Sequence, residues 1–191
     1  PAAHPDDVWA WDFVFDRTSN GTMLKWLVIV DEFTRECLCL HVDRNIRSDD
    51  VINELAKLFA TRGLPNHIRS DNGPEFTATT ISSWLRKLDL EVLYVEPGSP
   101  WENGYVESFN SRLRDEFLSL EQFENLSSAR SLTASFRHDY NGRRPHSSLG
   151  YMTPKDFATQ WPASAQSAAL PSLQQPTAAT KTQPLTQPEL S

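Results

Sequence analysis

Residues 8–15 read VWAWDFVF, a run of bulky and aromatic residues that is typical of a buried β-strand. Asp12 interrupts this run. Burial of an unpaired carboxylate is costly, so an acidic residue at this point needs a structural or chemical reason. Exposure on one face of the strand would be such a reason, but the flanking Trp9, Trp11 and Phe13 favour a functional role for Asp12.

The segments that follow extend this strand into an antiparallel meander. An SNG turn at residues 19–21 leads to a second apolar strand at residues 24–30, and the segment DEFTRE leads to a third at residues 37–42. Turns of this length are too short for a crossover helix, which predicts three antiparallel strands. Asp31 ends the second strand and is a candidate ligand, although pairing with Arg35 or closing the turn is the simpler interpretation.

The next part of the chain alternates helices and strands. Apolar residues at helical spacing predict a helix over residues 48–63, with Ser48 as its N-terminal cap and Gly63 at its C-terminal end. A short strand at residues 67–69 then delivers Asp71 at its carboxyl end, the edge at which ligands gather in open α/β sheets. A second amphipathic helix over residues 78–88 and a fifth strand at residues 91–95 follow.

A helix that begins at about Trp101 carries a third acidic residue, Glu107. Its apolar positions recur at steps of three and four and predict a core-facing side. A solvated carboxylate is the ordinary interpretation of a helical Glu, but the residues beside Glu107 are amides, a hydroxyl and a guanidinium, which suit a phosphate backbone. This polar face comprises Asn103, Glu107, Asn110, Ser111 and Arg114.

A further helix, capped by Ser127 and extending to Tyr140, leads into the basic loop NGRRPH at residues 141–146. An exposed polar turn and contact with phosphates both fit this loop. The remaining candidate DNA contacts are Asn72, Arg143, Arg144 and His146.

The composition limits the possible function classes. The net charge is −7, which is unusual for a DNA-binding protein and predicts that this chain alone binds DNA weakly. Cys37 and Cys39, the only cysteines, lie two apart in a predicted strand. We expect them to point the same way as small apolar residues, because no second Cys/His cluster has zinc spacing.

The end of the chain differs in composition from the rest. Residues 162–191 are rich in Ala, Ser, Gln, Pro and Thr and lack sustained periodicity, which predicts a disordered tail. The chain begins with Pro1 rather than Met, which indicates a fragment or a processed piece. No signal peptide and no apolar run of membrane-spanning length is present, so we expect a soluble cytoplasmic protein.

Five sequence motifs, in this order along the chain, resemble bacterial insertion-sequence transposases with a retroviral-integrase-like catalytic core, often called DDE transposases. Thirty-five residues separate Asp71 from Glu107, the spacing for which this family is named. The motifs are WxxD at residues 9–12, VDEFTRECL at 30–38, SDNGPEF at 70–76, ENGYVESFN at 102–110 and DYNGRRPHSSLGYMTP at 139–154.

The resemblance implies an α/β protein with an RNase H-like fold, whose five-stranded mixed sheet has its first three strands antiparallel and is flanked by helices. It also implies that Asp12, Asp71 and Glu107 are catalytic and hold two Mg²⁺ or Mn²⁺ ions, which suit carboxylate ligands. We therefore expect a lead-in over residues 1–7, an integrase catalytic core over residues 8–160 and a tail over residues 161–191.

The implied activity is DNA strand cleavage and strand transfer by direct phosphoryl transfer, with DNA element ends and a target duplex as partners. A homo-oligomer assembled on DNA is expected, because joining two ends to one target needs at least two active sites. Two alternatives remain: a metal-dependent nuclease of the same fold without strand transfer, and an inactive DNA-binding remnant.

Overall fold

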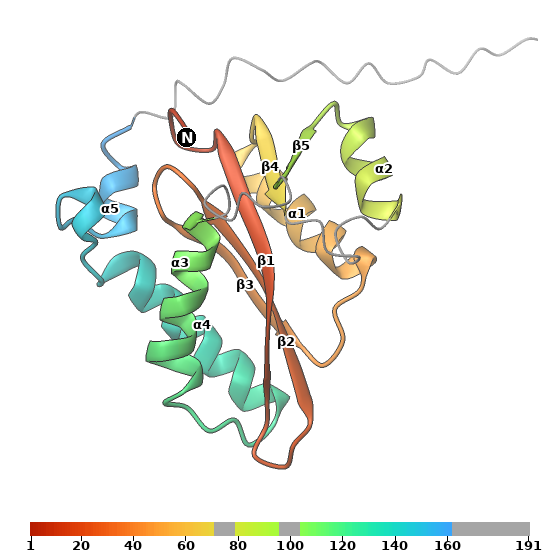
Figure 1. Ribbon diagram of the computed structural model, residues 1–191, viewed down its shortest axis with the longest axis vertical. Helices are drawn as coiled ribbons and strands as arrows, with labels where there is room; N and C mark the ends of the chain where they lie inside the picture. Colours follow the sequence, from red (N-terminus) through yellow and green to blue (C-terminus); the bar gives the residue numbers. More distant parts are fainter. Residues whose placement is uncertain (71–78, 96–103, 162–191) are drawn as a thin grey trace, which may run out of the picture.

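The computed structural model describes residues 1–70, 79–95 and 104–161, and its centre is one five-stranded sheet (Figure 1). The order of the strands across the sheet is β3-β2-β1-β4-β5. β1 pairs antiparallel with β2 and parallel with β4, so the sheet is mixed, as predicted. The strands are β1 (Val8–Arg17), β2 (Met23–Asp31), β3 (Cys37–Asp43), β4 (His67–Ser70) and β5 (Glu91–Tyr94).

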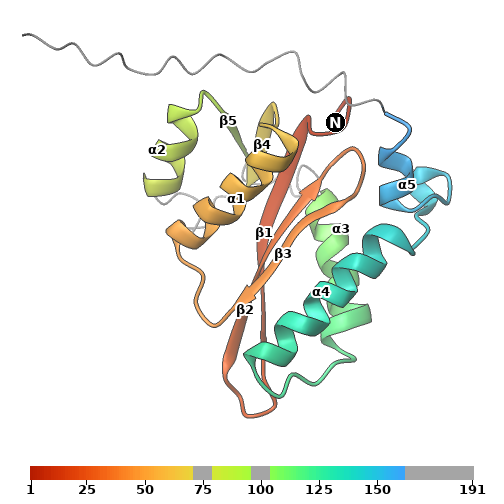
Figure 2. The ribbon, with the colours of Figure 1, turned by 180° about the vertical axis from the view of Figure 1, so that it is seen from behind.

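Helices cover both faces of the sheet, with α3 and α4 on one face and α1 and α2 on the other (Figures 1 and 2). The α-helices are α1 (Ser48–Arg62), α2 (Thr79–Lys87), α3 (Gly104–Leu113), α4 (Leu126–Gly142) and α5 (Pro154–Ala158). A π-helical turn, η2 (Arg114–Leu118), follows α3, and a 3₁₀ turn, η3 (Ser147–Leu149), precedes α5. The predicted arrangement of strands and helices is confirmed.

Alternation along β1 explains the two layers. Ala10 and Val14 belong to the core cluster beneath α3 and α4, whereas Trp9, Trp11 and Phe13 belong to the cluster beneath α1 and α2. Successive strand residues point to opposite faces, so the aromatic side of VWAWDFVF lies against one helical layer and the side with smaller residues against the other.

The pairing of β2 with β3 corrects the prediction for the two cysteines. Ile29 pairs with Cys39 but Val30 pairs with Cys37, so the register shifts at this point. Cys37 therefore joins the core beneath α4, and Cys39 joins the core beneath α1. Both thiols are buried, and burial raises the pKa of Cys39 to about 12 and that of Cys37 further.

The observed helix ends refine two predicted caps. Arg47, not Ser48, is the N-cap of α1, and the Asp50 carboxylate accepts a hydrogen bond from the Arg47 N–H at 2.8 Å. Gly63 ends α1 with φ 88°, as predicted, because glycine adopts this backbone conformation without steric cost. Asn125, not Ser127, caps α4 by accepting a hydrogen bond from the Ser128 N–H.

Side chains of α4 occupy the outer edge of β3. The Asn141 side chain accepts from the Cys37 N–H at 2.8 Å and donates to the Cys37 carbonyl at 3.0 Å. Arg137 donates to the carbonyls of Cys37 and Leu38, and Arg130 reaches the Val42 carbonyl. The helix thus satisfies backbone groups that an edge strand would otherwise leave to solvent.

The layer of α3 and α4 is anchored to β2 through Trp26. Its ring is fully buried and lies 5.5 Å from the ring of Phe123, measured between centroids. Its indole N–H donates to the Thr133 hydroxyl on α4 at 2.9 Å. Both groups are buried, so water cannot take the place of either partner if this hydrogen bond is lost.

We expect Thr133→Val to destabilise the protein by about 1–3 kcal/mol, because it leaves the buried Trp26 N–H without an acceptor. Urea unfolding measures this change as a shift in the transition midpoint. The control is Thr61→Val on the exposed surface of α1, which should change stability by less than about 0.5 kcal/mol. Equal stability of the two variants would contradict the importance of this contact.

Candidate active site

Asp12 lies in the middle of β1 and points toward the layer that contains α3. Its side chain is half-buried. One carboxylate oxygen, Oδ2, accepts a hydrogen bond from Nδ2 of Asn110 at 2.6 Å, and the other, Oδ1, accepts from the Phe13 N–H at 2.7 Å. The carboxylate is therefore held in a defined orientation by its own strand and by the helix across from it.

α3 supplies both Asn110 and Glu107. Asn110 is buried, with 7% of its surface exposed, whereas Glu107 is exposed in the first turn of the helix. Residues three apart are neighbours on a helix surface, so Glu107 lies one turn before the residue that contacts Asp12. The helix thus brings the predicted third carboxylate to the side of the sheet on which Asp12 lies.

Three predicted site residues, Asp71, Asn72 and Asn103, lie outside the described residues. The last described residue before Asp71 and Asn72 is Ser70, the buried end of β4. Within residues 1–70, 79–95 and 104–161, no three His, Cys, Asp or Glu side chains come together to hold a metal ion.

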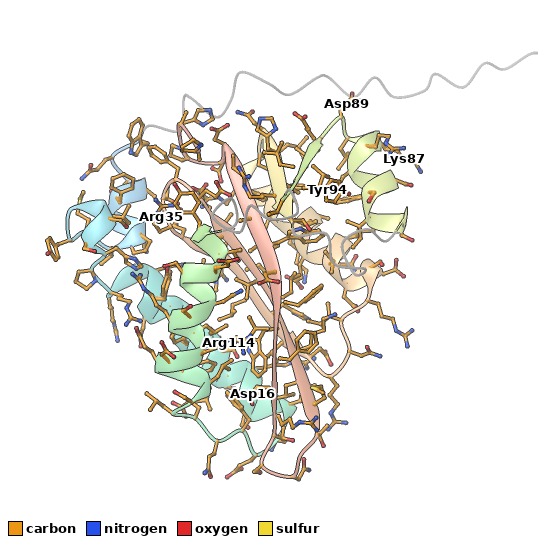
Figure 3. All side chains as sticks on the ribbon, viewed as in Figure 1. Asp16, Arg35, Lys87, Asp89, Tyr94 and Arg114 are labelled. Carbon is orange, nitrogen blue, oxygen red and sulfur yellow. The ribbon has the colours of Figure 1, made fainter. Side chains whose placement is uncertain are left out.

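The predicted DNA contacts on and after α3 fall into two groups. Ser111 and Arg114 are exposed beside Glu107, and the Ser111 hydroxyl donates to the Glu107 carbonyl at 3.1 Å (Arg114 is labelled in Figure 3). Asn110 is instead buried against Asp12, so its side chain holds a carboxylate rather than facing solvent.

The basic loop after α4 is partly engaged within the protein. Arg143 is exposed and forms an ion pair with Asp139, and Arg144 forms one with Glu116. His146 has only 2% of its surface exposed, and its Nδ1 lies 2.8 Å from Nη1 of Arg112 on α3. Of these three predicted contacts, only Arg143 and Arg144 offer charge at the surface.

Asp31 closes the turn between β2 and β3, which was the simpler of the two interpretations. Its Oδ1 accepts from the N–H groups of Phe33 and Thr34, and its Oδ2 accepts from the Asp6 N–H at 2.6 Å. Burial raises the pKa of Asp31 despite these hydrogen bonds. Arg35 interacts elsewhere, since its guanidinium stacks on the ring of Tyr105 at 3.8 Å.

A network of buried charges near this turn was not predicted. Asp6 is buried and accepts hydrogen bonds from Arg62 and from the Trp9 indole. Glu32, also buried, forms an ion pair with Arg69 at 2.7 Å. These partners are distant in sequence and share no motif, so no local signal could identify them.

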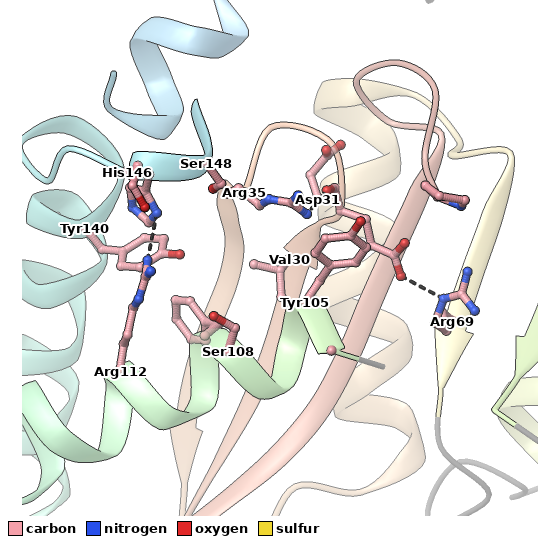
Figure 4. A pocket seen from close by; sticks show the side chains of 15 residues that line it. Val30, Asp31, Arg35, Arg69, Tyr105, Ser108, Arg112, Tyr140, His146 and Ser148 are labelled. Carbon is pink, nitrogen blue, oxygen red and sulfur yellow. Dashed lines mark hydrogen bonds and ion pairs between the residues drawn. The ribbon is translucent and has the colours of Figure 1, made fainter. Parts of the chain in front are cut away.

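A pocket of about 730 Å³ lies beside this network, between the β2–β3 turn, α3 and the loop after α4 (Figure 4). It contacts α3 through Tyr105, Ser108, Phe109 and Arg112. Each residue of an α-helix is rotated by about 100° around the helix axis from the one before it, so these positions lie on the opposite side of α3 from Glu107 and Asn110. The pocket and the Asp12 site are therefore separate, with α3 between them.

Family models match most of this chain. Residues 2–100 match a model described as "Integrase core domain", and residues 88–154 match a second model with the same description.

In the described residues, no helix is long and apolar enough to cross a membrane.

The similar proteins come from bacterial insertion elements. The chain is 42% identical to the insertion element IS476 uncharacterized 39.2 kDa protein of Xanthomonas euvesicatoria, over 82% of this chain and 45% of that protein. It is 40% identical to the insertion element IS407 uncharacterized 31.7 kDa protein of Burkholderia multivorans, over 86% of this chain and 60% of that protein. The chain thus spans about half the length of these relatives.

Solved structures with a similar fold include retroviral integrases. The HTLV-2 integrase catalytic core domain, solved in complex with magnesium, superposes with a TM-score of 0.66 at 17% identity, over 83% of this chain and 99% of that one. A chain of the simian T-cell lymphotropic virus intasome in complex with PP2A regulatory subunit B56 gamma gives a TM-score of 0.70 at 19% identity, over 96% of this chain and 63% of that one.

The strand order, the flanking helices and these neighbours define an RNase H-like fold, similar to that of retroviral integrase catalytic cores. Together with the family models, the similarity to insertion-element proteins places the chain more narrowly. It belongs to the integrase core domain family of insertion-element transposases.

We expect the pH dependence of stability to contain a contribution from His146. Burial and the nearby charges of Arg112, Arg144 and Arg35 lower the pKa of His146 from 6.5 to about 4. The unfolded chain therefore takes up this proton as the pH falls below about 6.5, while the folded chain stays neutral until about 4. Folding stability should fall through this window by up to about 3 kcal/mol.

Urea unfolding at a series of pH values measures this contribution. His146→Gln removes the titrating group, so the loss of stability between pH 6.5 and 4 should be smaller than in the unchanged protein. His138→Gln, at an exposed position of α4, is the matched control. An unchanged pH profile in His146→Gln would contradict the assignment.

Proposed function

We propose that this chain is the catalytic domain of a transposase that cleaves and joins DNA strands by metal-dependent phosphoryl transfer. The observation that carries the proposal is the contact between Asp12 on the central strand and Asn110 on α3, which also bears Glu107. Membership of the integrase core domain family supports the same conclusion.

We further propose that Asp71 completes an acidic triad with Asp12 and Glu107. β1 and β4 run parallel, with Val8 opposite His67 and Ala10 opposite Arg69. The same offset assigns position 71 to Asp12, one residue beyond the end of β4. A carboxylate at that position would lie beside Asp12, just beyond the carboxyl end of β4, and α3 would contribute Glu107.

The donor set fits hard divalent cations. Carboxylate oxygens suit Mg²⁺ or Mn²⁺, and Asp12 is already oriented by hydrogen bonds to both of its oxygens. Asp12, Asp71 and Glu107 would hold the ions, which when bound activate a water or 3′-hydroxyl nucleophile and stabilise the leaving oxygen. The HTLV-2 integrase core, solved with magnesium, supports this choice of ion.

The protein's own residues would perform the remaining tasks. Asn110 restrains Asp12, so the carboxylate does not need to reorient when a ligand arrives. Ser111 and Arg114, exposed after Glu107 along the chain, would contact a phosphate backbone, as would Arg143 and Arg144 on the basic loop. The domain would act on the bacterial chromosome, as an assembly with at least two active sites when two ends are joined.

Each of Asp12→Asn, Asp71→Asn and Glu107→Gln should reduce strand transfer by roughly 100-fold or more, because each removes a charged metal ligand. The assay supplies a pre-cleaved DNA end and a target duplex with Mn²⁺. The control is Asp16→Asn, which lies on the same face of β1 as Asp12 but near the C-terminal end of the strand, and it should retain activity (Figure 3). Cleavage without any joined product would instead favour a nuclease.

Asn110→Ala should raise the Mn²⁺ concentration needed for half-maximal activity by roughly 10-fold to 100-fold, the usual effect of removing a residue that orients a metal ligand. A merely structural role would lower activity without changing this metal dependence. Circular dichroism and urea unfolding of the same variant check that the fold is retained. Normal metal dependence with reduced turnover would contradict the positioning role.

A further inference from the structure

The pocket behind α3 has walls of uneven charge (Figure 4). Asp31 and Glu32 lie toward one end, where Asp31 accepts from three backbone N–H groups and Arg69 donates to Oε1 of Glu32. Oε2 of Glu32 is buried and has no hydrogen-bond partner among the described residues. Arg112 and His146 lie toward the other end. The acidic and basic side chains are thus separated along the pocket, and the end with Arg112 and His146 is the one suited to an anion.

Two guanidinium groups line the pocket without a close ion pair to a carboxylate in the described part of the chain, although the charge of Arg35 also acts on the Glu32 carboxylate. Arg112 donates to His146 and lies against the Tyr140 hydroxyl. Arg35 stacks on the Tyr105 ring and donates to the Glu32 carbonyl, a neutral acceptor. Both side chains keep their full positive charge, because arginine does not lose its proton in proteins.

His146 adds a buried donor to this basic end. Arginine can only donate, so Nδ1 of His146 accepts from Arg112 and the ring proton lies on Nε2. Nε2 has no hydrogen-bond partner among the described residues, and only 2% of the surface of His146 is exposed to solvent. An unsatisfied buried donor of this kind is unusual and points to a missing acceptor.

The loop that carries His146 is built to hold the ring in place. Its backbone pairs with Met152 in an isolated bridge, and the His146 N–H donates to the Met152 carbonyl at 2.9 Å. Gly150, whose φ is 63°, allows the tight turn between His146 and Met152. Tyr140 packs edge-on against the imidazole, with 4.9 Å between the ring centroids.

We propose that this pocket binds a backbone phosphate of DNA, on the side of α3 away from Asp12. The ligand would accept hydrogen bonds from Arg112, Arg35 and Nε2 of His146, with the Ser108 and Ser148 hydroxyls also on the pocket wall. A volume of about 730 Å³ gives room for one phosphate and its attached nucleoside, but not for a duplex. The choice of DNA rests on the proposed function, whereas the anion site itself does not.

The first experiment uses inorganic phosphate alone and follows the imidazole resonances of His146 by NMR. A saturable shift of the Nε2 resonance, absent in Arg112→Gln, is the expected result. Arg35→Gln is a second variant that leaves the Arg112–His146 contact in place and should weaken phosphate binding as well. Lack of any response of His146 to phosphate would overturn the anion site.

The second experiment measures binding of DNA with a single-stranded end as a function of salt concentration. Arg112→Gln should weaken binding roughly 10-fold and reduce the slope of log affinity against log salt by about 1, as expected for one lost phosphate contact. The control, Arg86→Gln on the exposed end of α2, should keep the affinity and slope of the unchanged protein.

These measurements need no catalysis, so an inactive chain does not affect their outcome. If phosphate binds at His146 but Arg112→Gln and Arg86→Gln bind DNA equally, DNA as the source of the phosphate is overturned. Loss of strand transfer in the triad variants would then still support the proposed function, which makes the two failures distinguishable.

Discussion

The contact between α3 and the centre of β1 is the constraint on which the rest of this domain depends. On the face toward α3, β1 presents Ala10, Asp12 and Val14, whereas its aromatic side chains lie on the other face. The small residues allow the helix to approach, and the Asp12–Asn110 hydrogen bond sets the position of the helix along the strand. α4, which lies in the same layer as α3 and is anchored to β2 through the Trp26–Thr133 hydrogen bond, packs against α3.

α3 therefore separates two chemically different regions. Toward β1 it presents an amide and a carboxylate, next to a strand aspartate, an arrangement suited to cations. Toward the loop after α4 it presents Arg112, beside a neutral buried histidine, an arrangement suited to anions. A polynucleotide carries its negative charge on every phosphate, so a helix with an acidic face for bridging ions and a basic face for direct contact can engage one strand in two ways.

The strands, the antiparallel meander and the helices were predictable from the sequence, because long apolar strands, short turns and helical spacing are local signals, whereas the mixed sheet was implied by the family resemblance. The sequence also identified Asp12 and Glu107 as chemically unusual in their surroundings. It did not predict the role of Asn110, which appeared to belong to an exposed polar face, nor the burial of His146. Both depend on what packs against them from distant parts of the chain. The Asp6–Arg62 and Glu32–Arg69 pairs have the same origin, and the opposite placement of Cys37 and Cys39 results from a one-residue irregularity that alternation cannot reveal.

The covering of β3 by α4 has a consequence for assembly. Arg130, Arg137 and Asn141 occupy backbone groups of β3 that another β-strand would need for pairing. Continuous β-sheets across neighbouring copies are therefore disfavoured at this edge, and with them one common route to aggregation. Contacts between copies of this domain at the β3 edge would therefore use side-chain surfaces, which can separate again, rather than shared backbone hydrogen bonds.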